Sequence, residues 1–183
     1  MHLDKKHEHY MNIAISYAKQ TNQIWPFAAI IVDHLGNIVV KATDCAHISP
    51  LFHAEALAIH VYALNFGHNY STSLTLYSTS ECDTLSQSVA YWANVTGIPI
   101  KTIVYGSSLE SIKEIWPFGI NIKADELMKH ACGANIELLG PVLEDECLTL
   151  FKEAKAKQEA IGKPHPGRAI LSKNYEDFFC IYK

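Results

Sequence analysis

Residues 76–86 read LYSTSECDTLS, a strand pattern that passes directly into the start of a helix. The apolar and β-branched residues over 74–78 predict a buried strand. Asp83 or Thr84 then begins a predicted helix that continues to about Val95, because Asp is among the best N-cap residues. A strand followed at once by a helix is the repeating unit of α/β folds, so the flanking sequence should continue this alternation.

Upstream, the sequence predicts a helix over residues 4–21, strands over 28–32 and 37–42, and a helix from His53 to about Phe66. Apolar residues recur at helical spacing in the first helix, and the second is assigned from the spacing of Leu57, Val61 and Leu64. The two strands are separated by residues 33–36, whose glycine favours a hairpin turn. An antiparallel pair therefore opens the sheet.

Downstream, the sequence predicts a strand over 102–105, a short helix near 124–131, an edge strand over 135–138 and a helix over 142–161. No element is assigned to residues 107–123. The alternation predicts parallel pairing beside the hairpin and helices on both faces of the sheet. The expected architecture is a three-layer α/β/α fold with a mixed sheet of about five strands.

The chain is organised as one domain over residues 1–162 and an aromatic C-terminal tail over 163–183. A chain of 183 residues with 49% hydrophobic content buries one sizeable core. We expect the tail to dock on its own or a partner's surface, because it contains Tyr175, Phe178, Phe179 and Tyr182.

Composition excludes several classes of protein. The formal net charge of -4 lacks the basic excess of a surface that follows phosphates, so nucleic acid is not an expected partner. No segment approaches the ~20 apolar residues needed to cross a bilayer, which favours a cytoplasmic protein without membrane contact. The 5 cysteines are scattered and never form C-x-x-C, which argues against a disulfide framework.

The motif His53-Ala54-Glu55 lies at the start of a predicted helix. Positions two apart lie ~200° around a helix, so His53 and Glu55 serve one pocket only if the helix end points into it. Alone, such a pair is more often a capping or surface feature. Its chemical meaning depends on the motifs around it.

Five short motifs follow one another between Pro26 and Gly106. They are Pro26-Phe27-Ala28-Ala29, His53-Ala54-Glu55, Leu76-Tyr77-Ser78-Thr79-Ser80-Glu81, Trp92-Ala93 and Val104-Tyr105-Gly106. In this order they resemble the cytidine/deoxycytidylate deaminase-like superfamily, particularly its guanine deaminase and tRNA adenosine deaminase branch. The resemblance implies the cytidine-deaminase-like fold and zinc-dependent hydrolytic deamination of a nucleobase.

The resemblance also implies roles for single residues. His53 would be a zinc ligand, and Glu55 the catalytic acid/base that carries a proton from the metal-bound water to the leaving ammonia. Phe27, Asp44 and Trp92 would contact the substrate, with Asp44 near a position where the family usually has Asn. Phe27 and Trp92 fit a hydrophobic core as well as a wall on which a base stacks.

The chain departs from the family at the other zinc ligands. Alignment of the motifs places Cys82 on a proline and Asp83 and Ser86 on the two cysteine ligands, so the candidate metal set is His53, Asp83 and Ser86. An aspartate can bind zinc, but a neutral serine hydroxyl is a poor replacement for a thiolate. The simpler explanation of Asp83 is a helix N-cap, which is favoured over the role of a metal ligand.

Three hypotheses follow for the function, and the sequence leaves open whether the protein is an enzyme. The first is a deaminase-family protein with a degenerate zinc site that binds a nucleobase or nucleoside as a ligand-binding or regulatory homologue. The second is an active metal-dependent deaminase of a purine or pyrimidine with a divergent metal site. The third is an interaction scaffold. Family members are commonly dimers, but no residue pattern fixes a homodimer interface here.

Overall fold

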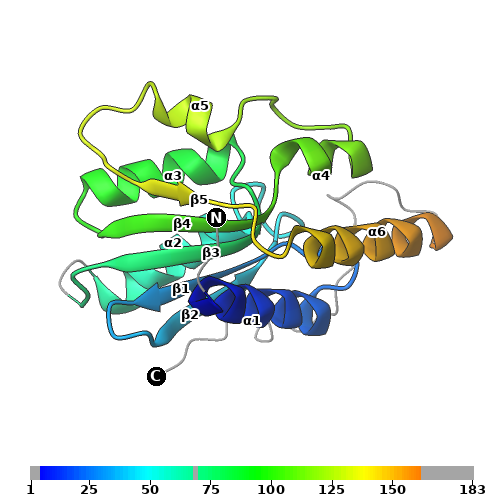
Figure 1. The fold of residues 1–183 in the computed structure, drawn as a ribbon, viewed down its shortest axis with the longest axis horizontal. Coiled ribbons are helices and arrows are strands. Elements are labelled where there is room, and N and C mark those ends of the chain that lie inside the picture. The colour runs from blue at the N-terminus through cyan, green and yellow to red at the C-terminus, as the bar shows by residue number, and fades with distance from the viewer. Residues whose placement is uncertain (1–4, 68–69, 162–183) are drawn as a thin grey trace.

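A computed structural model describes residues 5–67 and 70–161 as an α/β domain (Figure 1). The helices are α1 (Lys5–Thr21), α2 (Ala54–Phe66), α3 (Thr84–Val95), α4 (Leu109–Ile115), α5 (Ala124–Met128) and α6 (Glu144–Ala160). The strands are β1 (Ala28–Asp33), β2 (Ile38–Thr43), β3 (Leu74–Ser80), β4 (Ile100–Ser107) and β5 (Glu137–Leu139). Every element expected from the sequence is present. The predicted tail, 163–183, lies outside the described residues.

The five strands form one mixed sheet in the order β2-β1-β3-β4-β5, which confirms the predicted sheet. β1 runs antiparallel to both β2 and β3, whereas β3, β4 and β5 are parallel. The register pairs Ala28 with Thr43, and Ser80 with Ser107. The start of β1 and the ends of β2, β3 and β4 therefore meet at one edge of the sheet.

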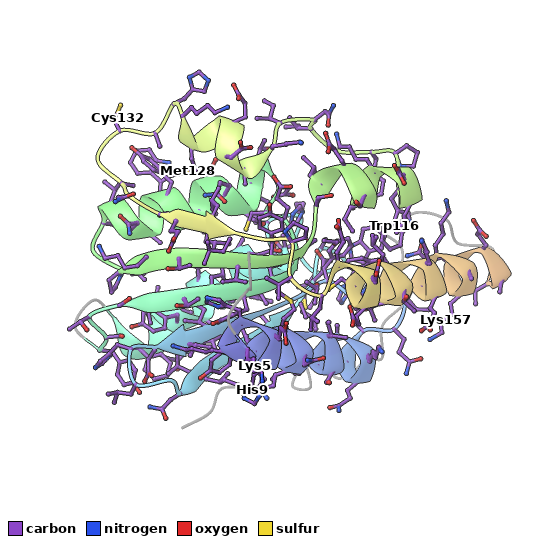
Figure 2. The ribbon with its side chains drawn as sticks, viewed as in Figure 1. Lys5, His9, Trp116, Met128, Cys132 and Lys157 are labelled. Atoms are coloured by element: carbon purple, nitrogen blue, oxygen red, sulfur yellow. The ribbon has the colours of Figure 1, made fainter. Side chains whose placement is uncertain are left out.

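Helices α1, α4 and α6 cover one face of the sheet, where their buried side chains form one of two hydrophobic clusters. Trp116, which ends α4, lies beside α6 (Figure 2), and its indole N–H donates to Gln158 Oε1 at 3.1 Å. Sequence analysis did not anticipate α4, a helix of only 7 residues whose N-cap is Ser108. None of the described helices is long and apolar enough to cross a membrane.

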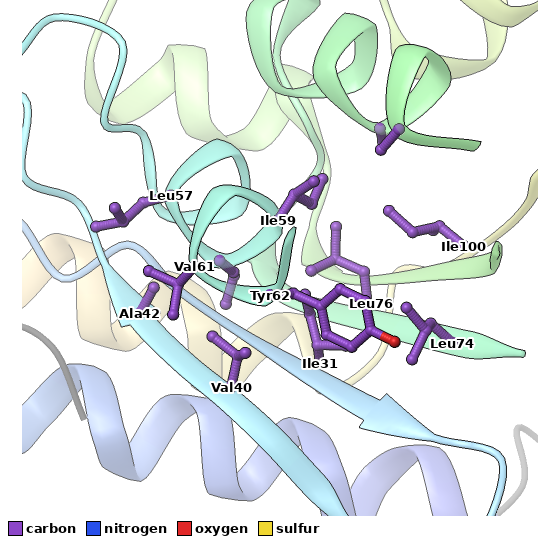
Figure 3. Close-up of a cluster of buried hydrophobic side chains, with 14 of the residues drawn as sticks. Ile31, Val40, Ala42, Leu57, Ile59, Val61, Tyr62, Leu74, Leu76 and Ile100 are labelled. Atoms are coloured by element: carbon purple, nitrogen blue, oxygen red, sulfur yellow. The ribbon is translucent and has the colours of Figure 1, made fainter. Parts of the chain in front are cut away.

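Helices α2 and α3 cover the opposite face of the sheet, and α2 packs on β1 and β2 (Figure 3). Residues 54–59 of α2 are all buried, as are Val61 and Tyr62, so the helix is apolar on nearly every side. Leu57 and Val61 face the core as their spacing predicted, but Leu64 is 72% exposed. The predicted apolar stripe thus ends one turn early.

The buried carboxylate of Glu81 fixes the segment that carries α4. It follows β3 and accepts the backbone N–H of Leu109 at 2.8 Å and that of Ala124 at 2.8 Å. These two residues begin α4 and α5, and the residue Glu81 is only 7% exposed. One side chain therefore holds both ends of the segment 109–124 against the sheet edge.

We predict that Glu81→Gln loosens this segment, because an amide offers one oxygen acceptor where the carboxylate offers two. Loss of a buried hydrogen bond to a charged group should lower the free energy of unfolding by on the order of 1–3 kcal/mol. Hydrogen exchange should accelerate at the amides of Leu109 and Ala124. The same change at Glu153, an exposed residue of α6, is the control and should leave both readouts unchanged.

Candidate active site

The candidate site lies at the sheet edge where β1 begins and β2, β3 and β4 end. A cavity of about 380 Å³ opens there. It is lined by Phe27 before β1, Asp44 after β2 and Glu81 after β3, together with the first residues of α2 and α3. Strand ends and helix starts converge on this edge, as is usual for ligand sites in α/β proteins.

The first turns of α2 and α3 are joined by a short polar contact. Asp83 is the N-cap of α3, and its Oδ1 accepts the backbone N–H of Ser86 at 2.7 Å. Its Oδ2 lies 2.7 Å from Nδ1 of His53, the N-cap of α2. The capping role predicted for Asp83 is confirmed, and both of its carboxylate oxygens have partners.

Glu55 is held between two serines beneath this contact. Ser86 Oγ donates to Oε2 of Glu55 at 3.0 Å, and Ser78 Oγ on β3 donates to Oε1. Glu55 is 4% exposed. Burial is the main cause that raises the pKa of its carboxyl group, and the charge of Asp83 adds to the effect.

The pKa values of His53 and Asp44, which also line the cavity, are raised. The hydrogen bond to Asp83 raises the pKa of His53 to about 9, although burial alone would lower it. Burial raises the pKa of Asp44 to about 7, against the lowering effect of the Ala46 backbone N–H that Oδ1 of Asp44 accepts at 3.0 Å. Asp44 is therefore partly protonated at neutral pH.

An aromatic wall faces these polar groups. Trp25 and Trp116 meet with ring centroids 4.7 Å apart, and Phe118 stacks on Trp25 at 5.7 Å. Phe27 also contacts Trp25, at 5.1 Å, and packs against Phe151 of the core at 4.7 Å. Phe27 thus belongs to the hydrophobic core and to the cavity lining, as both interpretations of its sequence position allowed.

The structure brings together all but one of the residues singled out from the sequence. Those that meet at the cavity or directly beneath it are Phe27, Asp44, His53, Glu55, Asp83 and Ser86. Trp92 lies elsewhere, on the outer side of α3, where it is 61% exposed.

Sequence analysis missed Ser78 as a partner of Glu55, and it missed the two tryptophans and Phe118 of the aromatic wall. A signal for the wall was available. The tetrapeptide IWPF occurs at residues 24–27 and again at 115–118, and both copies line the cavity.

The donor set beside Glu55 does not match a four-coordinate zinc site. Within residues 5–67 and 70–161, no group of three or more His, Cys, Asp and Glu side chains is placed to hold a metal ion. The side chains of His53 and Asp83 bond to each other, and the Ser86 hydroxyl is engaged with Glu55. As arranged, these donors satisfy one another instead of converging on a common point.

Comparison with solved structures supports the fold. A guanine deaminase from Nitrosomonas europaea is 16% identical, with a TM-score of 0.67 and coverage of 81% of this chain and 84% of that chain. A tRNA:A34 deaminase that edits the wobble position of transfer RNA is 18% identical, with a TM-score of 0.58 and coverage of 78% and 98%. A structure that contains 2,6-diaminopurine is 15% identical, with a TM-score of 0.66 and coverage of 91% and 85%.

Comparison of sequences assigns the family. No curated protein gives a significant match. The family model of the cytidine and deoxycytidylate deaminase zinc-binding region matches residues 4–100, which is more than half of the 183 residues. The protein therefore belongs to the cytidine and deoxycytidylate deaminase family.

Proposed function

We propose that the protein binds a nucleobase or nucleoside in the cavity of about 380 Å³ without the zinc-dependent deamination of its family. The direct contact of 2.7 Å between His53 Nδ1 and Asp83 Oδ2 carries this proposal. In a zinc site both atoms would bind the metal. Here the atoms bind each other, and Asp83 at the same time caps α3.

Without a metal, the chemistry lacks an activated water. Zinc lowers the pKa of its bound water from ~15.7 to ~7, which corresponds to on the order of 12 kcal/mol of nucleophile activation. Glu55 is held by Ser78 and Ser86 in a buried position and does not replace that effect.

The cavity has features that suit a planar heterocycle. Trp25, Phe27 and Trp116 supply aromatic faces and edges. Asp44 supplies a carboxyl group whose pKa of about 7 lies close to neutral pH. Such a mixture of apolar walls and few polar groups is typical of small-molecule sites. Solved structures of the same fold contain 8-azaguanine and 2,6-diaminopurine, which makes purines the first ligands to test.

A second candidate is an active deaminase with a divergent metal site. It is favoured by the placement of Asp83 and Ser86 beside Glu55, with His53 one short contact away. This function requires the contact between His53 and Asp83 to open so that both side chains face one ion. Metal content and ammonia release separate it from the first proposal.

We predict that 8-azaguanine or 2,6-diaminopurine raises the melting temperature without turnover. At a ligand concentration of ~100 times Kd, the stabilisation is about 2.7 kcal/mol. Thermal unfolding and ammonia assays on the same samples provide the test. Ammonia release from guanine, adenine, cytosine or their nucleosides would support the second candidate instead. If the protein neither binds nor deaminates any of these compounds, the result would support the third hypothesis, an interaction scaffold.

We predict that protein purified without added zinc contains well under one zinc per chain, and that a chelator leaves its melting temperature unchanged. The double variant Asp83→Cys/Ser86→Cys should gain about one zinc per chain, because thiolates supply the missing donors. Asp83→Ala/Ser86→Ala is the matched control, since it removes the same side chains without adding thiolates. A full complement of zinc in the native protein, measured by mass spectrometry, would contradict the proposal.

We predict that Asp44→Asn stabilises the protein above neutral pH. Because the folded-state pKa of Asp44 is about 7 against 3.8 ordinarily, native stability falls as pH rises from about 4 through 7. Asn keeps the oxygen that accepts from Ala46 and does not ionise. Urea unfolding should show equal stability at pH 3.5 and a gain for the variant on the order of 4 kcal/mol at pH 8. If the difference in stability between the variant and the native protein is the same at all pH values, ionisation of Asp44 is not its cause.

A further inference from the structure

The segment 109–124, which runs from the start of α4 to the start of α5, borders the cavity of the candidate site (Figure 1). It contributes a group of large apolar side chains to the lining, namely Leu109, Ile112, Trp116, Phe118 and Ile120. Residues 109, 112 and 116 are spaced by three and four positions, which places them on one helical face. These five residues form the apolar side of the cavity.

The charged and hydroxyl side chains of the lining come from a different part of the chain. Among the described residues, all of them except Lys113 belong to residues 44–84. Lys113 is half-buried, and such a lysine lays its methylene stem along apolar surface while its ammonium group stays in water. The cavity therefore has a polar side and an apolar side. A ligand that fills both needs a polar part and an apolar part.

The protein itself covers the apolar side only in part. Leu109 and Trp116 are buried, whereas Phe118 is 50% exposed and Ile120 is 60% exposed. Exposed apolar surface at the edge of a cavity is typical of a site that a ligand covers. A ligand that covers Phe118 and Ile120 removes apolar area from water, which favours binding.

The apolar side is held in position by hydrogen bonds from outside it. Glu81 accepts the backbone N–H groups of Leu109 and Ala124, at 2.8 Å each. The indole N–H of Trp116 donates to Gln158 Oε1 at 3.1 Å. A surface fixed in this way needs little ordering when a ligand arrives, so the entropic cost of binding is low.

The polar part of the ligand is expected at Asp44. This residue is only 6% exposed, and its Oδ1 accepts the Ala46 backbone N–H at 3.0 Å. Among the described residues, its Oδ2 has no hydrogen-bond partner. A buried acceptor in this state favours a ligand that brings a donor, such as a ring N–H or an amino group. A substituent on the ring can then extend to the apolar side.

We propose that the ligand of this cavity is a nucleobase with an apolar substituent, such as an N-alkylated or N-benzylated purine, whose substituent covers Phe118 and Ile120. The inference rests on the function proposed above and specifies the class of its ligand. Unsubstituted bases leave the apolar side in contact with water, and the sugar of an ordinary nucleoside brings hydroxyl groups to it. Both should bind more weakly than the substituted base.

The test measures Kd on the full chain by isothermal titration calorimetry, with adenine, adenosine, 6-benzylaminopurine and 9-benzyladenine as probes. At least one of the two benzyl compounds should bind about tenfold or more tightly than adenine, because burial of a phenyl group contributes at least that factor. Adenosine, whose substituent is a polar sugar, should show no such gain.

Two matched variants locate the effect within the segment. Ile120→Ala shortens an exposed side chain of the apolar side, so the ratio of Kd for adenine to Kd for the benzyl compound should fall about fivefold. Ile122→Ala is the control, since Ile122 is 40% exposed and does not line the cavity, and the ratio should stay unchanged. Melting temperatures of both variants show that they fold.

The possible outcomes separate this inference from the function on which it rests. If adenine or 8-azaguanine binds and neither benzyl compound binds more tightly than adenine, the inference fails and the proposed function stands. If none of these compounds binds, both fail.

Two further results would overturn the inference even if a benzyl compound binds tightly. If Ile122→Ala lowers the ratio as much as Ile120→Ala, the gain comes from adhesion to exposed apolar surface. If sedimentation shows a dimer that Ile120→Ala dissociates, a second copy of the chain covers the apolar side.

Discussion

The geometry of the candidate site depends on the direction of one strand. Because β1 runs against both β2 and β3, its first residues lie at the same sheet edge as the ends of those strands. Parallel pairing of β3 with β4 adds a third strand end at this edge. Residues as distant in sequence as Phe27 and Leu109 thereby line one cavity. Reversal of β1 would place Phe27 and Asp44 at opposite edges, and the cavity would not form.

The segment 109–124 forms one wall of the cavity. Hydrogen bonds to Glu81 hold this wall in place, and aromatic packing shapes it. Glu81 accepts hydrogen bonds at both ends of the segment that contains α4, and Trp116 from that segment meets Trp25 from before β1. The two contacts reinforce each other, because the carboxylate fixes where the segment lies and the rings fix how close it approaches. The buried carboxyl group of Glu81 is tolerated here because each of its oxygens accepts a backbone N–H.

Sequence reasoning was most successful where local pattern and tertiary role coincide. The alternation around residues 76–86 located β3 and α3, and Asp83 was correctly identified as a cap.

Prediction from the sequence failed where contacts between distant residues determine the structure. Nothing local to Ser78 distinguishes a strand serine from a partner of Glu55, which is 23 residues away. The 7-residue helix α4 is held from outside by Glu81 and carries too few turns to show a periodicity. Trp92 showed the limit of motif matching, since its position in the motif order did not reveal which side of α3 it occupies.

The double use of Asp83 limits which side chains this position can carry without loss of stability. Its carboxylate caps the start of α3 and at the same time contacts the imidazole of His53, the N-cap of α2. A change of Asp83 to cysteine would forfeit both contacts, of which the cap alone contributes roughly 1 kcal/mol. The identity of this one side chain is therefore coupled to the starts of two helices.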